Sequence, residues 1–230
     1  MFDVWHVFLI SAVGALLALD RTVAFQVMVS RPIVSGPVIG LVLGQPGVGV
    51  TVGAMLELIW IGTPPLGGRL PPHECLAAVV TTAAVCMAYP AGMPISRSLI
   101  VLGLLLAPLI ARLGAIMEFQ LRRINLRIVK RAKDAVQSGR DVSLFRFNLM
   151  GAAWYFAACF LFLAIFVPLT GFGLATVHPR LTPDWHGALD LMFLVLPLIG
   201  ITAALSSLNL RRKILTFTLF FAGGALLLAI

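Results

Sequence analysis

The sequence predicts an all-α integral membrane protein: a polytopic helix bundle with broken or re-entrant helices in its glycine-rich N-terminal third. Of its 230 residues, 60% are hydrophobic and only 11% are charged, whereas soluble domains carry about 25% charged residues. The apolar residues gather in stretches close to the ~20 residues that a helix needs to cross a bilayer. The charges cluster at the ends of these stretches. We therefore expect residues 1–230 to form a single membrane domain.

Six stretches are candidate membrane spans, the first of them short. They are Val4–Leu19, Leu76–Ile95, Ser98–Met117, Asn148–Pro168, Ala188–Leu208 and Ile214–Ile230. A signal peptide needs a basic start, but the residues before the first stretch include Asp3 and no Lys or Arg. We therefore expect that stretch to remain as the first helix.

The segment Ile33–Gly62 is apolar but irregular. Glycines recur at every fourth position from Gly36 to Gly44, and Gln45-Pro46-Gly47 has the composition of a turn. Small residues at this spacing allow two helices to approach closely. Thirty residues are too many for one span, so we expect two short, broken or re-entrant helices that are covered by protein or line a cavity.

Basic residues predict the orientation of the second half. Eight of the seventeen lie between Arg122 and Arg146, and Arg211, Arg212 and Lys213 form a second cluster. Because cytoplasmic loops carry an excess of Lys and Arg, both clusters are expected inside the cell. The loop Thr170–Gly187 then lies outside. The net charge of +8 is explained by this bias, so we expect no nucleic-acid partner.

The basic cytoplasmic segment, about 118–147, is predicted to be amphipathic. Within 118–138, Leu121, Ile124, Ile128 and the pair Ala132/Ala135 share one face of a helix. Such a helix can lie on the anionic inner leaflet. It can also serve as a docking surface for a soluble partner, and both interpretations stay open.

The chain shows no pattern typical of an enzyme or of a metal site. Cys75, Cys86 and Cys159 lack metal-ligand spacing and sit in or beside apolar runs, as small buried hydrophobic residues do. The histidines His6, His73, His178 and His186 are scattered. No nucleophile–base pair or paired carboxylate stands out, so we expect a protein that is not an enzyme and needs no cofactor.

Glu57 is the most informative single residue. It is the only ionisable group between Pro32 and Pro65, and a charge at mid-bilayer costs about 2.5–3.5 kcal/mol even on the lenient insertion scale. It is expected to face a transport pathway or a ligand, or else to form a structural ion pair with Arg31. Trp60, one turn later, either stacks on a sugar or packs in the core; packing is favoured.

Two further polar segments flank this region. Asp20, Arg21, Gln26 and Arg31 follow the first span, and Arg21 is interpreted as an ordinary helix-end charge. Gln26 lies in an apolar run, where an amide needs a hydrogen-bonding partner. A carboxylate with an amide is the chemistry that binds sugar hydroxyls. The segment from Gly67 to Glu74, with its double proline, is expected to form a rigid turn.

A series of short motifs together resembles one known family. The motifs are Arg31-Pro32-Ile33-Val34, Gly36-Pro37, Gly40-Leu41-Val42-Leu43-Gly44, Gly53-Ala54-Met55-Leu56-Glu57-Leu58-Ile59-Trp60-Ile61-Gly62, Gly67-Gly68 and Pro71-Pro72. They resemble the membrane IIC subunit of the mannose/fructose/sorbose phosphotransferase system, a sugar permease. The resemblance is dense over about residues 15–85. Beyond that range, which includes the C-terminal helices 148–230, it rests on hydropathy. Gln45 and His73 stand where the family often has Asp.

The resemblance implies a function, a site and partners. A IIC subunit pairs with a IID membrane subunit and forms a larger oligomer. It carries a hexose across the bacterial inner membrane by an elevator-like motion, and a IIB protein, supplied with phosphate through IIA, phosphorylates the hexose. Phosphoryl transfer is thus expected on partner proteins. The resemblance places the sugar near Glu57, Asp20 and Gln26, and Arg31, Trp60 and His73 complete the expected substrate-binding set.

Two other functions remain open. One is a stand-alone permease for a small solute or ion, with Glu57 as the coupling carboxylate. The other is a degenerate, regulatory subunit of the phosphotransferase system.

Overall fold

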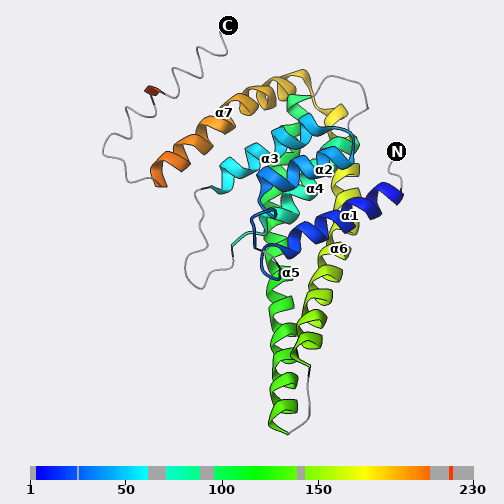
Figure 1. The fold of residues 1–230 in the computed structure, drawn as a ribbon. Helices are drawn as coiled ribbons and strands as arrows, with labels where there is room; N and C mark the ends of the chain where they lie inside the picture. Colours follow the sequence, from blue (N-terminus) through cyan, green and yellow to red (C-terminus); the bar gives the residue numbers. More distant parts are fainter. Residues whose placement is uncertain are drawn as a thin grey trace.

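The computed structural model describes residues 4–24, 26–61, 71–88, 96–138, 143–207 and 218–219. Within these ranges the chain is helical and contains no strand, so the predicted all-α fold is confirmed (Figure 1). The elements are α1 (Val4–Leu19), α2 (Pro32–Val42), α3 (Pro46–Trp60), α4 (Glu74–Ala88), α5 (Arg97–Gln137), α6 (Leu144–Val177), the 3-10 turn η1 (His178–Arg180) and α7 (Pro183–Ser207).

Helix α4 lies at the centre of the bundle. Every residue from Cys75 to Cys86 is buried, and α1, α2, α3, α5 and α6 all pack against it. Its many alanines leave room for neighbouring backbones to approach. The helix begins two residues before the predicted span Leu76–Ile95, and residues 89–95 lie outside the described part of the chain.

Helices α2 and α3 form the expected pair of short helices in the glycine-rich region. Each begins with a proline as its first residue, a position at which the missing N–H costs nothing. The chain reverses at Leu43–Gln45, just before the predicted turn, and Gly44 has a φ of +69°, which glycine adopts without strain.

The two helices approach so closely that side chains are excluded between them. A Cβ at Gly49 would lie 2.5 Å from the carbonyl oxygen of Gly36, and a Cβ at Gly53 would lie 2.5 Å from that of Pro32. The predicted small-residue faces therefore join α2 to α3.

The basic segment after Met117 differs from the prediction. It does not form a separate surface helix, because α5 runs without a break from Arg97 to Gln137. No glycine or proline follows Met117 to end the helix before Ser138. Leu121 and Ile128, expected to face lipid, are instead buried.

The segment Thr170–Gly187, which was predicted to be a loop, is instead mostly helical. Helix α6 continues through Pro168 to Val177, and η1 and the start of α7 take up most of the remaining residues. Apolar packing extends the helix: Leu174 is 1% exposed, and its side chain lies near Gly103 of α5.

Within the described ranges, three helical segments are long and apolar enough to cross a membrane: Arg97–Gln137, Phe145–Arg180 and Pro183–Ala204. The shorter helices α1 to α4 are apolar as well. The predicted last span Ile214–Ile230, apart from residues 218–219, lies outside the described residues, as do the cluster Arg211–Lys213 and residues 62–70.

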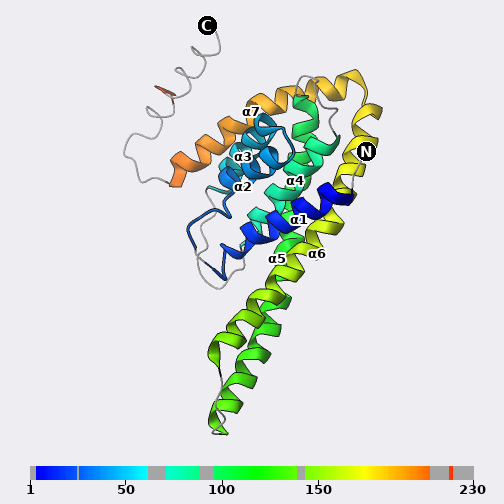
Figure 2. The ribbon, with the colours of Figure 1, turned by 45° about the vertical axis from the view of Figure 1, so that its right-hand side comes forward.

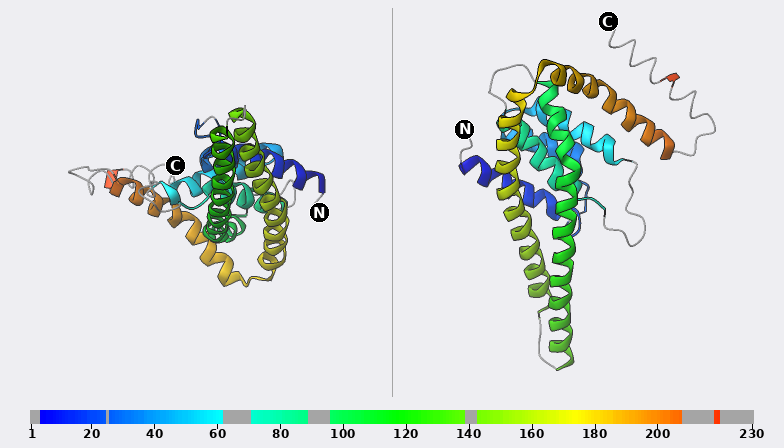
Figure 3. Two further views of the ribbon diagram at one scale, coloured as in Figure 1. Left: turned by 90° about the horizontal axis from the view of Figure 1, so that it is seen from below. Right: turned by 180° about the vertical axis from the view of Figure 1, so that it is seen from behind.

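The most prominent feature of the shape is a long antiparallel helix pair. Helices α5 and α6 lie side by side, and α1 to α4 pack around only one half of their length (Figures 1 and 2). The other half projects from the body in Figures 1 and 2 and in the right-hand view of Figure 3. We call this projecting part, residues 121–137 of α5 and 144–154 of α6, the arm.

Candidate functional site

Six charged side chains of alternating sign form a continuous chain through the bundle. Glu57 of α3 pairs with Arg31, Arg31 with Glu74 of α4, Glu74 with Arg21, Arg21 with Glu118 of α5, and Glu118 with Arg122. These residues come from three helices and from the loop between α1 and α2. The chain of charges therefore joins elements that are far apart in sequence.

Glu57 and Arg31 form the first link. The Arg31 Nε donates to Glu57 Oε1 at 2.9 Å, and a terminal guanidinium nitrogen donates to the same oxygen. The second carboxylate oxygen accepts from the backbone N–H of Ile33 at 3.3 Å. The structural ion pair, one of the two interpretations of Glu57, is thus present in this structure.

Arg21 is the central link, in contrast to its predicted role as an ordinary helix-end charge. Its guanidinium lies 3.4 Å from Glu74 Oε1 and 3.5 Å from Glu118 Oε2. It also donates to the carbonyl oxygen of Pro72 at 3.0 Å. The Glu118 side chain is only 2% exposed. A carboxylate so deeply buried needs a cation beside it, and Arg21 and Arg122 provide two.

Asp20 organises the loop that carries Arg31. Its carboxylate accepts hydrogen bonds from the backbone N–H of Val27 at 2.7 Å, and from the backbone N–H and hydroxyl of Ser30 at 3.2 and 3.3 Å. Gln26 and Met28 in this loop have left-handed φ values of 54° and 68°, a conformation that costs energy outside glycine. The bonds to Asp20 hold the strained loop in place.

The remaining predicted site residues differ in accessibility. The side chain of Gln26 is exposed. His73 is fully buried: its backbone N–H donates to the Ala111 carbonyl at 2.9 Å and its Nε2 lies 3.1 Å from the Tyr155 hydroxyl. Trp60 is 6% exposed and belongs to the hydrophobic core, as the packing interpretation expected.

Sequence reasoning brought Glu57, Arg31 and Asp20 to one region but missed three partners. Glu74 and Glu118 were not singled out, and Arg21 was assigned to the interface. The one local signal was the spacing of Glu118 and Arg122, which is that of an i,i+4 ion pair. The other links join residues 26 or more positions apart and leave no periodic trace.

Accessibility changes along the chain of charges. At one end, Arg31 and Glu57 are 33% and 17% exposed. The middle is more enclosed, with Arg21 at 11% and Glu118 at 2%, and Arg122 at the other end is open at 55%. The Arg31–Glu57 end therefore offers a partly accessible pair of donor and acceptor groups, which sugar hydroxyls can bind.

The described residues hold no group of three or more His, Cys, Asp or Glu arranged for a metal ion.

A second polar cluster joins the start of α5 to η1 and α7. The Ser98 hydroxyl lies 3.0 Å from His178 Nε2 and 3.1 Å from His186 Nδ1. These contacts tie helix ends together.

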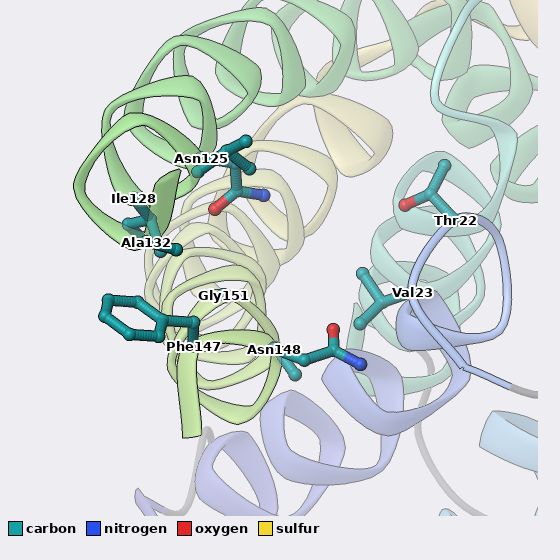
Figure 4. Close-up of a pocket in the computed structure, with 10 residues that line it drawn as sticks. Thr22, Val23, Asn125, Ile128, Ala132, Phe147, Asn148 and Gly151 are labelled. Carbon is teal, nitrogen blue, oxygen red and sulfur yellow. The ribbon is translucent and has the colours of Figure 1, made fainter. Parts of the chain in front are cut away.

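A cavity of about 400 Å³ lies where the loop after α1 meets the arm. Asn125 of α5 and Asn148 of α6 contribute amides to its lining, and Thr22 and Val23 line the opposite side (Figure 4). The Asn125 Oδ1 is buried and has no hydrogen-bond partner among the described residues. The cavity contains none of the residues predicted for the sugar site.

Comparison with known proteins gives a match over nearly the whole chain. The family model described as "PTS system sorbose-specific iic component" matches residues 4–229. The chain is 47% identical over 53 residues to a putative N-acetylgalactosamine permease IIC component 2 of Escherichia coli K12, which covers 23% of this chain and 40% of that protein. It is 26% identical over 124 residues to the mannose-specific EIIC component of the same organism, which covers 54% of this chain and 41% of that protein. The chain thus spans about two fifths of the length of these curated relatives.

A solved structure described as "Structure of membrane protein" has the same fold. It superimposes with a TM-score of 0.72 at 18% identity, over 96% of this chain and 85% of the other. At this identity the likeness concerns the fold alone.

Proposed function

Because the chain belongs to the sorbose-specific IIC family of the phosphotransferase system, a family of permeases rather than catalytic subunits, we propose that it carries a hexose across the bacterial inner membrane. The observation that carries the proposal is the family match over residues 4–229. The description of the family and the names of the relatives make sorbose, mannose and N-acetylgalactosamine the sugars to test.

The proposed sugar contact is the partly accessible Arg31–Glu57 end of the chain of charges. A carboxylate accepts hydroxyl hydrogens and a guanidinium donates to hydroxyl oxygens, and Glu57 and Arg31 present both groups side by side. Gln26, exposed on the loop that Asp20 holds, is the third proposed contact. Asp20, Trp60 and His73 are proposed to position these groups, since all three are buried against the protein.

The proposed partners follow from the family. A IID membrane subunit pairs with this chain and the pairs assemble into a larger oligomer, while soluble IIB and IIA proteins supply the phosphate. The lipid bilayer covers the many large apolar side chains exposed on α1, α6 and α7, such as Trp5, Leu161 and Leu191.

The test is a double-mutant cycle on Glu57 and Arg31, with yield of the assembled complex and sugar affinity measured in the same preparation. Glu57→Gln keeps the shape and removes the charge. A hydrogen bond to a charged group contributes about 1.5–3 kcal/mol, against about 0.5–1.5 for a neutral one. If Glu57 binds the sugar, Glu57→Gln should therefore weaken the sugar affinity about five- to thirtyfold. The same loss is expected in the native protein and in the Arg31→Gln variant.

A purely structural Glu57 gives the opposite pattern. Glu57→Gln then lowers the yield because Arg31 is left unpaired, Arg31→Gln restores it, and the assembled protein binds sugar with native affinity. That pattern would refute the proposed contact. Asp134→Asn, which neutralises an exposed carboxylate on the arm, is the matched control and should change neither quantity.

A further inference from the structure

The α5 side of the arm carries an exposed basic face. Its six cationic side chains lie within about half of the helix circumference at ~100° per residue. They are Arg122, Arg123, Arg127, Lys130, Arg131 and Lys133, all exposed. The one acidic residue of that face is Asp134.

These cations have few anionic partners. Within the described part of the chain, Arg122 is the only one of the six in an ion pair, with Glu118; Arg123 instead lies over the ring of Phe119 at 4.7 Å. Arg127 has Arg123 one turn before it and Arg131 one turn after it, and like charges at this spacing destabilise a helix. The basic face therefore carries a repulsion that an acidic partner would relieve.

The geometry argues against a lipid surface as that partner. A helix lying on a leaflet buries its apolar face in lipid, but Leu121 and Ile128 on the apolar face of α5 are buried within the protein and Ile124 packs against the same core. The arm also projects away from the body (Figure 3).

The distance of the basic face from the membrane interface also argues against lipid as the partner. Tryptophan concentrates at the membrane interface, and Trp154 of α6 is 52% exposed. Gly151 of α6 lies beside Asn125 of α5, because a Cβ at Gly151 would be 3.5 Å from the Asn125 Oδ1. Trp154 lies one turn nearer the body than Gly151, so along the antiparallel pair it is at about the same height as Leu121. At 1.5 Å per residue, Lys130 and Arg131 stand about 14–15 Å beyond that level, whereas attraction to anionic lipid fades within a Debye length of about 8 Å.

The α6 side of the arm adds exposed apolar groups beyond the same level. Phe145 is 74% exposed and Leu149 is 59% exposed. Aromatic residues and arginine are enriched at protein–protein interfaces, and exposed apolar groups beside them mark such sites.

We propose that the arm is the docking surface for an acidic face of a soluble cytoplasmic protein. Its basic residues place it on the cytoplasmic side. The partner's identity rests on the proposed function: it is the IIB phosphocarrier, which must come close to the membrane subunit to phosphorylate the sugar.

The test measures binding of purified IIB protein to the complete membrane complex in nanodiscs of neutral and of anionic lipid. The variant combines Arg123→Gln, Arg127→Gln, Lys130→Gln and Arg131→Gln. The control exchanges the same four residues while keeping their charge: Arg123→Lys, Arg127→Lys, Lys130→Arg and Arg131→Lys. The glutamine variant should bind IIB about ten- to hundredfold more weakly at low salt, the combined effect of four exposed ion pairs. The control should stay within about twofold of the native complex.

Native-like IIB binding by the glutamine variant would overturn the proposal. So would a loss that occurs only in anionic nanodiscs, because the arm would then act on lipid, and so would a native complex that does not bind IIB. Sugar affinity, measured in the same nanodiscs, is expected to be unchanged by the four substitutions. If the native complex binds none of the sugars, the proposed function is refuted, and the IIB measurement alone still decides whether the arm is the docking surface.

Discussion

At the scale of single residues, the chain of charges shows how a membrane bundle accommodates ionised groups. Glu118 is almost completely buried, and an uncompensated buried charge destabilises a protein by several kcal/mol. Arg21 lies in the loop after α1, and its guanidinium contacts both Glu118 and Glu74. One cation thus compensates two carboxylates and connects α4 with α5.

Replacing Arg21 should therefore be costly. We expect Arg21→Met to lower the free energy of unfolding by about 3–5 kcal/mol, because Glu118 loses one of its two cations. The double variant Arg21→Met/Glu118→Met should recover most of this loss, because an apolar pair needs no compensation. Unfolding in detergent, followed by circular dichroism, measures both. Lys133→Met removes an exposed cation of α5 as the control and should cost less than about 0.5 kcal/mol. An equally small cost for Arg21→Met would contradict the account.

Sequence reasoning reached only part of this network. Glu57 was conspicuous because it is isolated in an apolar run, and Arg31 is the nearest cation that precedes it in the sequence. Arg21 stands 53 positions from Glu74 and at the end of a helix, where a charge needs no explanation. Only the packing of α1, α4 and α5 brings these residues together, and that packing leaves no pattern in a single sequence.

At the scale of elements, the α2–α3 pair depends on glycine where the two backbones meet. We expect Gly49→Ala to destabilise the protein by about 1–3 kcal/mol, as overpacking does, because the new methyl group would lie 2.5 Å from the Gly36 carbonyl oxygen.

The control for this prediction is Gly173→Ala in α6. A Cβ there meets no atom within 4 Å, so alanine should stabilise the helix by up to about 1 kcal/mol. Thermal unfolding of the two variants in the same detergent measures the difference. Equal midpoints would show that the close approach of α2 and α3 is not needed for stability.

Prediction of the elements succeeded where local chemistry decides and failed where packing decides. Two short helices with a turn near Gln45 were predicted, and α2 and α3 follow that pattern, although the chain turns at Gly44 and Pro46 already begins α3. Pro168, in contrast, was taken as the end of a span, but α6 continues through it. A proline inside a helix leaves a backbone carbonyl without its hydrogen bond. In a membrane bundle, neighbouring helices and side chains can satisfy that group, so the helix continues.

At the scale of the whole molecule, α4 forms a buried centre and the long pair α5–α6 extends from the core into the arm (Figure 1). Composition alone predicted the membrane fold class. The arm was not predicted, because the change from an apolar to a basic amphipathic sequence at Met117 is typical of the end of a span. A helix that continues through such a change requires a partner for its apolar face, and α6 is that partner.

The central claim is that this chain transports sugar as part of a phosphorylating system, and uptake tests it most directly. The chain is reconstituted in liposomes with a IID subunit, with or without phosphorylated IIB inside, and labelled mannose, N-acetylgalactosamine or sorbose is added outside. The account predicts that at least one of these sugars accumulates inside as its phosphate, and only when IIB is present. Accumulation of free sugar at the same rate without IIB would identify a stand-alone permease and contradict the account, as would the absence of uptake for all three sugars.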